Sequence, residues 1–417
     1  MTGDAYGATD AIWRIESARL IAGLARMVRD VGLAEDLAQD ALVAALEQWP
    51  RSGVPDNPGA WLMATGRRRA IDRIRRDVRL QRKYTEIGRE REAEEAATPD
   101  LSAEVADEVG DDLLGLVFTT CHPVLSTEAR VALTLRLVGG LTTPEIARAF
   151  LVPEATVAQR IVRAKRTLTA ARVPFEVPSG GELDERLGSV LEVVYLVFNE
   201  GYSATSGDDW MRPALCDDAL RLGRILAELA PGEPEVHGLV ALMEIQASRT
   251  AARVDRAGQP ILLLDQDRSR WNRILITRGL AALRRAEELG GPLGPYGLQG
   301  AIAACHGRAR TPEETDWERI AALYDALAQL VPSPVVELNR AVAVAMAFGP
   351  QEGLDLVDGL ADEPTLAAYH LLPAVRGDLL SKLDRRPEAR AEFERAASMT
   401  HNAREQEVLL ARAAECA

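Results

Sequence analysis

The stretch LTTPEIARAFLVPEATVAQRIVRAKRTL, residues 141–168, decides the fold of the first part of this chain. Thr142 followed three residues later by Glu145 is a capping box, and the proline between them is favoured in a first helical turn. A short helix follows, then a turn, and Pro153 opens a second helix that we expect to run to Arg172. Two short helices joined by a tight turn are typical of a helix-turn-helix.

The second helix of this pair is basic, with five bases and no acid in residues 158–172. In a major groove, Gln can pair with adenine and Arg with guanine, and small or apolar side chains can meet thymine methyl groups. Basic side chains beside them would contact phosphates, which makes binding salt-dependent. The candidate base-reading residues are Ala158, Gln159, Val162 and Arg163, and the candidate phosphate contacts are Arg160, Lys165 and Arg166. The alternative is a solvated helix hairpin in a bundle. The capping box, the tight turn and the basic charge together favour the helix-turn-helix over it.

Charge is divided unevenly along the chain. The 417 residues carry 49 Lys and Arg against 63 Asp and Glu, a net charge of −14 that argues against non-specific coating of nucleic acid. Residues 1–172, however, hold 25 acids and 24 bases, whereas residues 173–417 hold 38 acids and 25 bases. The acidic excess therefore belongs to the second part, and the first part remains compatible with DNA binding.

Within the first part, a basic and an acidic segment follow one another. Residues 67–83 carry nine bases and two acids, and residues 86–112 carry eleven acids and two bases. The acidic segment has few large apolar residues, so we interpret it as a solvated linker between two basic helices.

The remaining composition predicts an all-α protein, because long alternating runs of β-branched residues are absent. The length suggests two to four domains. Four widely spaced cysteines without a CxxC pair indicate neither a disulfide framework nor a zinc site, so we expect a reducing cytoplasm and no metal. We expect no signal peptide and no membrane span, because neither type of apolar segment is found.

Two further motifs precede the linker, in a region expected to be helical over residues 10–77. The first, AEDLAQDALVAALEQWP at residues 34–50, has amphipathic spacing, and Pro50 and the loop at residues 52–58 are expected to break it. The second, NPGAWLMATGRRRAIDRIRR at residues 57–76, predicts a helix with one apolar face and one arginine-rich face.

In their order and spacing, these three motifs resemble an extracytoplasmic-function (ECF) RNA polymerase sigma factor over residues 10–172. The resemblance implies a region 2 domain at residues 10–80, the acidic linker at 81–110 and a region 4 helix-turn-helix domain at 111–173. It implies core RNA polymerase and promoter DNA as partners. Region 2 would dock on the β′ clamp helices, and region 4 would contact the β flap. The polymerase-binding residues carried over from the family motif are Asp36, Gln39 and Asp40.

The resemblance also implies two promoter elements. The second motif would melt and read the −10 element and capture a flipped base through Asn57, Trp61, Arg67, Arg68, Asp72 and Arg75. We favour a packing role for Trp61 and a helix or core role for Asp72. The −35 element would be read by the second helix of the helix-turn-helix. The chain departs from the family pattern by having Arg68 directly after Arg67, which leaves the −10 preference open.

Beyond residue 178, about ten helical segments follow. A set of residues recurs 36 positions later and resembles the tetratricopeptide pattern, whose period is 34. The first set is Ala341, Val344, Gly353 and Val357, and the second is Gly377, Leu380, Ala389 and Phe393, followed by Ala396. Ordinary antiparallel helix pairs are the alternative.

NEGY (199–202) and LLDQDRSRWN (263–272) resemble the long extension of a minority of ECF factors, here residues 179–417. Such factors generally lack a membrane anti-sigma partner, and the extension is thought to control activity. No catalytic or phosphate-binding motif appears, so we expect no enzyme and no cofactor. We interpret Asp265, Asp267, Arg268 and Arg270 as an Asp–Arg network that holds helices together, and Trp271 as a core residue.

The sequence thus predicts a cytoplasmic alternative sigma factor without membrane attachment. Its extension would be a protein-interaction scaffold or a ligand sensor. The acidic extension could also contact the sigma core and cover its basic helices in the free protein. The alternative is a helix-turn-helix activator with a tetratricopeptide-like module, which would bind duplex DNA without melting it.

Overall fold

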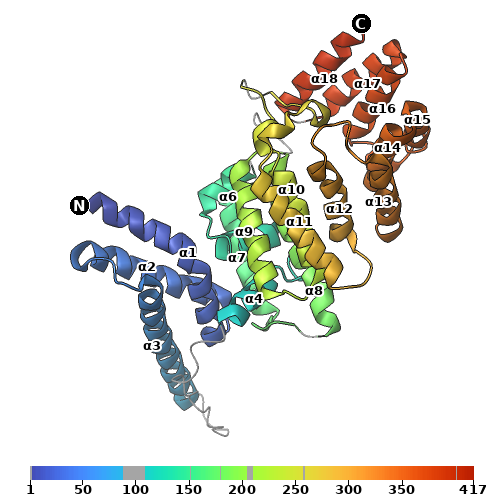
Figure 1. The fold of residues 1–417 in the computed structure, drawn as a ribbon. Coiled ribbons are helices and arrows are strands. Elements are labelled where there is room, and N and C mark those ends of the chain that lie inside the picture. Colours follow the sequence, from blue (N-terminus) through green and yellow to red (C-terminus); the bar gives the residue numbers. More distant parts are fainter. Residues whose placement is uncertain are drawn as a thin grey trace. The chain divides into compact units, whose positions relative to one another are not determined.

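The chain is helical in the computed structural model, which describes residues 2–87, 109–150, 152–178, 180–203, 210–256, 259–400 and 402–417. Within these residues one isolated β-bridge joins Val254 and Pro260, and the named elements are all helices (Figure 1). The all-α prediction is therefore confirmed. The chain divides into two compact units, Met1–Val193 and Val194–Ala417, which are described one at a time.

The first unit begins with three helices, α1 (Thr2–Val28), α2 (Val31–Ser52) and α3 (Pro58–Ile87). The Asp30 side chain caps α2 by accepting a hydrogen bond from the Leu33 amide at 2.8 Å. The expected break at Pro50 is wrong, because α2 continues through Pro50 to Ser52. In the last turn of a helix, a proline removes only one backbone bond, and the Gly53 amide still bonds the Trp49 carbonyl at 2.9 Å.

The helix-turn-helix follows α4 (Val109–Thr120) and α5 (Thr127–Leu137), and it consists of α6 (Thr143–Ala149) and α7 (Glu154–Ala170). Thr142 and Glu145 form the predicted capping box. The Thr142 amide donates to the Glu145 carboxylate at 2.7 Å, and the Glu145 amide donates to Thr142 Oγ1 at 3.4 Å. Because the local sequence satisfies the exposed amides at the start of α6, the predicted helix-turn-helix is confirmed.

Most of the predicted acidic linker lies outside the described residues. Helix α3 continues to Ile87 and α4 begins at Val109. At the other end of the first unit, the start of α8 (Gly181–Tyr202) packs against α4 and the turn after it. Arg186, only 5% exposed, donates to the Phe118 carbonyl at 2.9 Å, and the Ser189 hydroxyl donates to the Cys121 carbonyl at 2.6 Å. The boundary between the compact units lies inside α8, after Val193, and the start of the extension at residue 179 stays a prediction.

Within its described residues, the second unit contains the end of α8 and ten further α-helices. They are α9 (Pro213–Leu229), α10 (Pro234–Ala247), α11 (Arg273–Glu288), α12 (Pro295–Arg308), α13 (Trp317–Leu330), α14 (Pro334–Phe348), α15 (Pro350–Asp358), α16 (Leu371–Lys382), α17 (Arg386–Met399) and α18 (Ala403–Glu415). Short 3-10 helices are η1 (Thr250–Ala252), η2 (Leu263–Asp265), η3 (Arg268–Arg270) and η4 (Pro364–Leu366). Many α-helices start with proline, which suits the first turn because its missing amide would have no helical partner there.

The recurring residues of the second unit lie where consecutive helices cross. A side chain at Gly353 on α15 would begin 2.4 Å from the Ala345 methyl group on α14. A side chain at Gly377 on α16 would begin 3.0 Å from the Phe393 ring on α17. Small residues at these two positions therefore allow the backbones of each helix pair to approach closely.

None of the helices in the described ranges combines the length and the apolar character that a membrane span requires.

Candidate promoter and polymerase interfaces

Helix α7 separates a buried face from an exposed one, as the sequence predicts. Val157, Ile161, Ala164 and Leu168 are buried against the first unit. The opposite side carries the candidate base-reading residues, all of them exposed: Ala158, Gln159, Val162 and Arg163. Val162 is 45% exposed, which leaves an apolar group free to meet a thymine methyl group.

The basic residues beside this face differ in their surroundings. Arg166 is exposed and Arg160 is half-buried. Lys165 forms an ion pair with Glu35 of α2, and its side chain is only 20% exposed. In this conformation Lys165 therefore bonds a carboxylate of the same chain, and its contact with phosphate stays a prediction.

Glu35 is the centre of a contact between α2 and the helix-turn-helix domain that the sequence did not reveal. It is 3% exposed, and besides Lys165 it accepts a hydrogen bond from Arg136 Nε on α5 at 2.8 Å. Burial by itself would raise the pKa of Glu35, but the charges and hydrogen bonds of Lys165 and Arg136 outweigh it and hold the pKa below its ordinary value. Nearby, the Thr169 hydroxyl donates to the Asp30 carboxylate at 2.8 Å.

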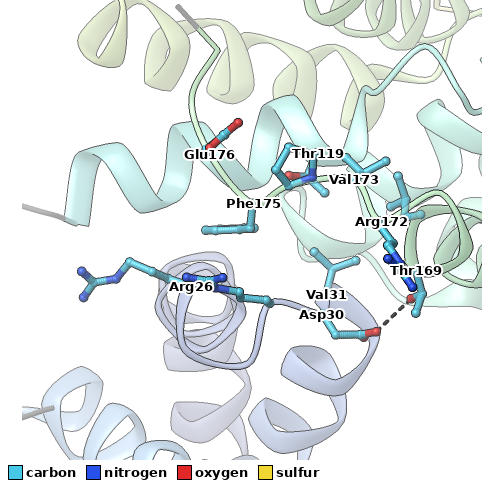
Figure 2. Close-up of a pocket in the computed structure, with 12 residues that line it drawn as sticks. Arg26, Asp30, Val31, Thr119, Thr169, Arg172, Val173, Phe175 and Glu176 are labelled. Atoms are coloured by element: carbon cyan, nitrogen blue, oxygen red, sulfur yellow. Dashed lines mark hydrogen bonds between the residues drawn. The ribbon is translucent and has the colours of Figure 1, made fainter. Parts of the chain in front are cut away.

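A cleft of about 530 Å³ lies beside this contact, between the α1–α2 turn and the end of α7. Figure 2 shows Arg26 and Arg172 on its walls, with the Asp30–Thr169 hydrogen bond at one side. Arg26 forms an ion pair with Asp112 of α4 at 3.2 Å. The end of α7 is thus held against the start of α2 partly by polar contacts beside an open cleft.

The predicted polymerase-binding residues share α2 with Glu35. Asp36 and Asp40 are exposed and lie four residues apart, so they lie on one side of the helix. Gln39 is half-buried and donates to Glu35 at 2.9 Å, and Asp40 lies 3.7 Å from Arg69 of α3. All three residues are thus on α2, but Gln39 is bonded to Glu35 and Asp40 is ion-paired with Arg69, although Asp40 remains exposed.

The predicted −10 residues lie along the start and middle of α3. Asn57 caps this helix by accepting from the Ala60 amide at 3.0 Å. Trp61 packs edge-on against Trp49 with ring centres 5.4 Å apart, as expected for a packing residue. Arg68 and Arg75 are exposed and Arg67 is half-buried; Asp72 is exposed, so a core role for it is wrong.

The interpretation of the DQDRSRW segment as an Asp–Arg network is wrong. Arg268 donates to the carbonyls of His306 at 3.2 Å and Ala309 at 3.1 Å and to the Thr315 hydroxyl at 2.9 Å. Asp267 instead points to solvent and caps η3 by accepting from the Ser269 amide at 2.9 Å. Gln266 and Arg268 are buried whereas Asp265 and Asp267 are exposed, so successive residues of this segment point in different directions. Trp271 is 3% exposed, which confirms its core role.

The described residues can be compared with the geometry that a metal site or a reactive thiol requires. In the described part of the chain, no group of three or more His, Cys, Asp or Glu side chains could hold a metal ion. All four cysteines are buried and free, and burial raises the pKa of the Cys121 thiol to about 11 and of Cys216 to about 12. The thiols of Cys121 and Cys216 therefore stay protonated at neutral pH and are poor nucleophiles.

Three family models match the chain. Sigma-70 region 2 matches residues 15–80, and Sigma-70, region 4 matches residues 116–168. A family of unknown function, DUF6596, matches residues 186–287, which include the second half of α8 and the LLDQDRSRWN segment.

Similar proteins fall into two kinds. An uncharacterized protein of Rhizobium meliloti (strain 1021) is 45% identical over 407 residues, covering 95% of this chain and 94% of that protein. The ECF RNA polymerase sigma factor SigK of Mycobacterium ulcerans (strain Agy99) is 30% identical over 152 residues, 35% of this chain and 75% of that protein. The probable ECF RNA polymerase sigma factor SigI of Mycobacterium tuberculosis (strain CDC 1551 / Oshkosh) is 31% identical over 173 residues, 40% of this chain and 56% of that protein.

Proposed function

The chain belongs to the ECF RNA polymerase sigma factors, and we propose that it reads the −35 element through α7 and the −10 element through α3, and that its helical extension regulates its activity. As a sigma factor it directs transcription initiation and is not an enzyme. The observation that carries the finer proposal is the exposed face of α7 within a capped helix-turn-helix that matches region 4.

We assign −35 recognition to four exposed residues of α7. Gln159 and Arg163 are four positions apart and lie on the same side of the helix, so both can face base edges when α7 enters a major groove. Ala158 and Val162 lie beside them and are small enough for close approach. Arg160 and Arg166 would bind the flanking phosphates.

Polymerase binding is assigned to α2 and −10 recognition to α3. The exposed carboxylates of Asp36 and Asp40 suit a basic surface such as the one that the β′ clamp helices would supply. Arg68 and Arg75 are exposed and suit the backbone of a melted strand. The β flap is the proposed partner of the region 4 domain.

In the arrangement of the first unit that we call closed, Glu35 of α2 bonds Lys165 of α7 and Arg136 of α5. Lys165 cannot bind a DNA phosphate while it binds Glu35, and Glu35 is adjacent to the proposed polymerase contact Asp36. Polymerase and promoter binding would therefore compete with this contact. A contact between the acidic extension and the basic helices stays a prediction.

For the end of the extension, from α14 to α17, we propose a tetratricopeptide-like scaffold of stacked helix pairs. Its support is the close packing at Gly353 and Gly377, together with the burial of Ala389, Phe393 and Ala396 at the recurring positions. Stacked helix pairs present extended surfaces to partners.

Run-off transcription with the full chain and purified core polymerase tests the proposed mechanism. The expected result is a transcript from a cognate promoter without any other sigma factor, and its loss when the −35 element is scrambled. A protein that binds duplex promoter but yields no transcript unless another sigma factor is added would be a helix-turn-helix activator instead.

A further inference from the structure

Among the residues that the structure describes, three arginines of the second unit have no carboxylate partner. Arg253 and Arg268 are 5% and 4% exposed, and Arg249 is half-buried. Arg253 donates to the Tyr202 carbonyl, Arg249 donates to the Tyr202 hydroxyl, and Arg268 bonds two carbonyls and a hydroxyl. In the described ranges no carboxylate lies within ion-pair distance of these three guanidinium groups. Burying a cation without a counter-charge is costly, so this cluster needs an explanation.

Aromatic rings accommodate the arginines without neutralising them. The Arg253 guanidinium lies 3.6 Å from the centre of the Tyr202 ring and 4.5 Å from that of Trp210. Arg249 lies 5.6 Å from the Tyr202 ring and 5.7 Å from the Trp271 ring. The electron-rich ring faces attract the guanidinium groups, yet the net positive charge remains.

The surroundings of Arg268 extend the same positive region. Its guanidinium lies 4.9 Å from the Trp271 ring, and its Nε is buried without a hydrogen-bond partner. Glu313 and Glu314 act on Arg268 only from beyond ion-pair distance. Burial, and then the charge of Arg249, lower the pKa of Arg268, which is the response expected of a cation beside another cation.

A cavity of about 210 Å³ opens next to Arg249, between α10, η2, α12 and α13. Its polar lining consists of Gln246, Arg249, Gln299, His306 and Tyr324, and the rest of the lining is apolar. No carboxylate lines it. The cavity is smaller than sites for drug-sized ligands, which restricts an occupant to a small molecule.

Two of these polar groups are neutral at physiological pH. Burial, helped by the charges of Arg249 and Arg268, lowers the pKa of His306 to about 3, and its Nδ1 is buried without a partner. Burial raises the pKa of Tyr324 to about 12, so its hydroxyl keeps its proton. The cavity thus combines one fixed cation with neutral hydrogen-bonding groups and apolar walls.

We propose that this cavity binds a small organic carboxylate, with its charged group on Arg249 and its apolar part against Leu242, Ile245 and Ile302. A carboxylate accepts two hydrogen bonds from a guanidinium, and the Tyr324 hydroxyl supplies a further donor. The apolar walls favour an organic body over an inorganic anion. Tyr202, Leu263 and Trp271 around the site come from the NEGY and LLDQDRSRWN motifs, which the sigma function leaves unexplained. The binding site is argued independently of the proposed function. Only the expected effect of the bound carboxylate on transcription rests on that function.

Isothermal titration of the full chain with benzoate and 3-methylbutanoate, each beside its matching amide, tests the site. The expected result is binding of at least one carboxylate at least tenfold tighter than its amide. Hydrogen exchange should slow in peptides covering residues 242–249 and 299–306. If neither carboxylate binds, if the amides bind equally, or if inorganic phosphate binds and the carboxylates do not, the proposal is wrong.

Variants locate the binding. Arg249→Gln should abolish carboxylate binding, and the exposed Arg278→Gln on α11 is the matched control that should not change it. Tyr324→Phe removes only a hydroxyl and should weaken binding about tenfold, which keeps the test decisive if Arg249→Gln fails to fold. Unchanged binding in Tyr324→Phe, or unchanged binding in a folded Arg249→Gln, would overturn the assignment. A carboxylate that binds as expected but leaves run-off transcription unchanged would contradict regulation by the extension and not the site.

Discussion

Replacing Glu35 with glutamine tests the closed arrangement of the sigma unit most directly. Glu35 is 3% exposed and bonds Arg136 and Lys165 from the other domain of the first unit. Glutamine has the same size and can keep one neutral hydrogen bond, so the substitution removes the negative charge and leaves the packing. The matched control is Asp36→Asn, which removes the same charge from an exposed neighbour.

The expected loss of stability in Glu35→Gln follows from the strength of the two charged hydrogen bonds and from the burial of Arg136 and Lys165. A hydrogen bond to a charged group is worth about 1.5–3 kcal/mol, roughly 1–1.5 more than a neutral one. Two such differences give about 2–3 kcal/mol, and relief from burying the carboxylate offsets part of it. Arg136 and Lys165 are 26% and 20% exposed, so each regains water when Glu35 is neutral. We expect a net loss of about 1–2 kcal/mol of local stability, against under about 0.5 kcal/mol for Asp36→Asn.

The pH dependence has a definite sign. The folded-state pKa of Glu35 lies below its ordinary value of 4.5, so the ion pairs stabilise the fold fully above that value. Their contribution is lost as pH falls through the lower folded-state pKa. Glu35→Gln should therefore lose stability at pH 7 and show a flatter dependence on acidic pH than the natural protein.

Hydrogen exchange of the full chain, read in peptides from α2 and α7, measures this local stability. A double-mutant cycle with Lys165→Met should give a coupling of about 1 kcal/mol, because each substitution removes the same ion pair. Peptides from α16 and α17 serve as the internal reference and should not change. Additive effects, with a coupling below about 0.3 kcal/mol, would show that the Lys165–Glu35 pair is not formed in solution and would refute the closed arrangement.

Three further experiments, each with its own control, give separate tests. Arg163→Ala should weaken binding to the preferred −35 duplex by about 1–3 kcal/mol more than to scrambled duplex, as fluorescence anisotropy would show. Arg166→Ala should weaken both equally, and equal losses for Arg163→Ala would make Arg163 a phosphate contact. Phe393→Ala should cost about 3–5 kcal/mol in urea unfolding of the extension, because the ring is buried beside Gly377; Phe348→Ala, whose ring is 58% exposed, should cost under about 0.5 kcal/mol. Deleting the chain from residue 178 onward should speed hydrogen exchange in α4, because it removes the buried Arg186. Deletion from residue 204 onward keeps Arg186 and should leave exchange in α4 unchanged. Equal protection of α4 in both variants would contradict the structural role of α8.

Much of the candidate DNA-binding face could be predicted because it depends on local rules. The capping box fixes where α6 starts, since Thr142 and Glu145 are three residues apart and bond each other. Helical periodicity then separates the buried Ile161 from the exposed Val162 and Arg163. These features are settled by residues within one or two turns of each other.

The Asp–Arg interpretation of the LLDQDRSRWN segment failed for a related reason. Residue type indicated charge pairing, but Asp267 bonds the next turn of its own backbone and Arg268 bonds carbonyls of residues about 40 positions away. Which carbonyls a buried arginine meets depends on how α12 and the chain after it pass the segment, and no local pattern encodes that path.

By itself, then, the sequence determined the helical class, the helix-turn-helix and the exposed residues of α7, because capping and periodicity act between near neighbours. Only the tertiary structure decided that Lys165 bonds Glu35 and that Arg249 lies beside a cavity without a counter-charge. Both outcomes depend on burial by segments far apart in the chain. Burial removes the water that would otherwise screen these charges, so the partner that packing brings within reach determines how each one acts.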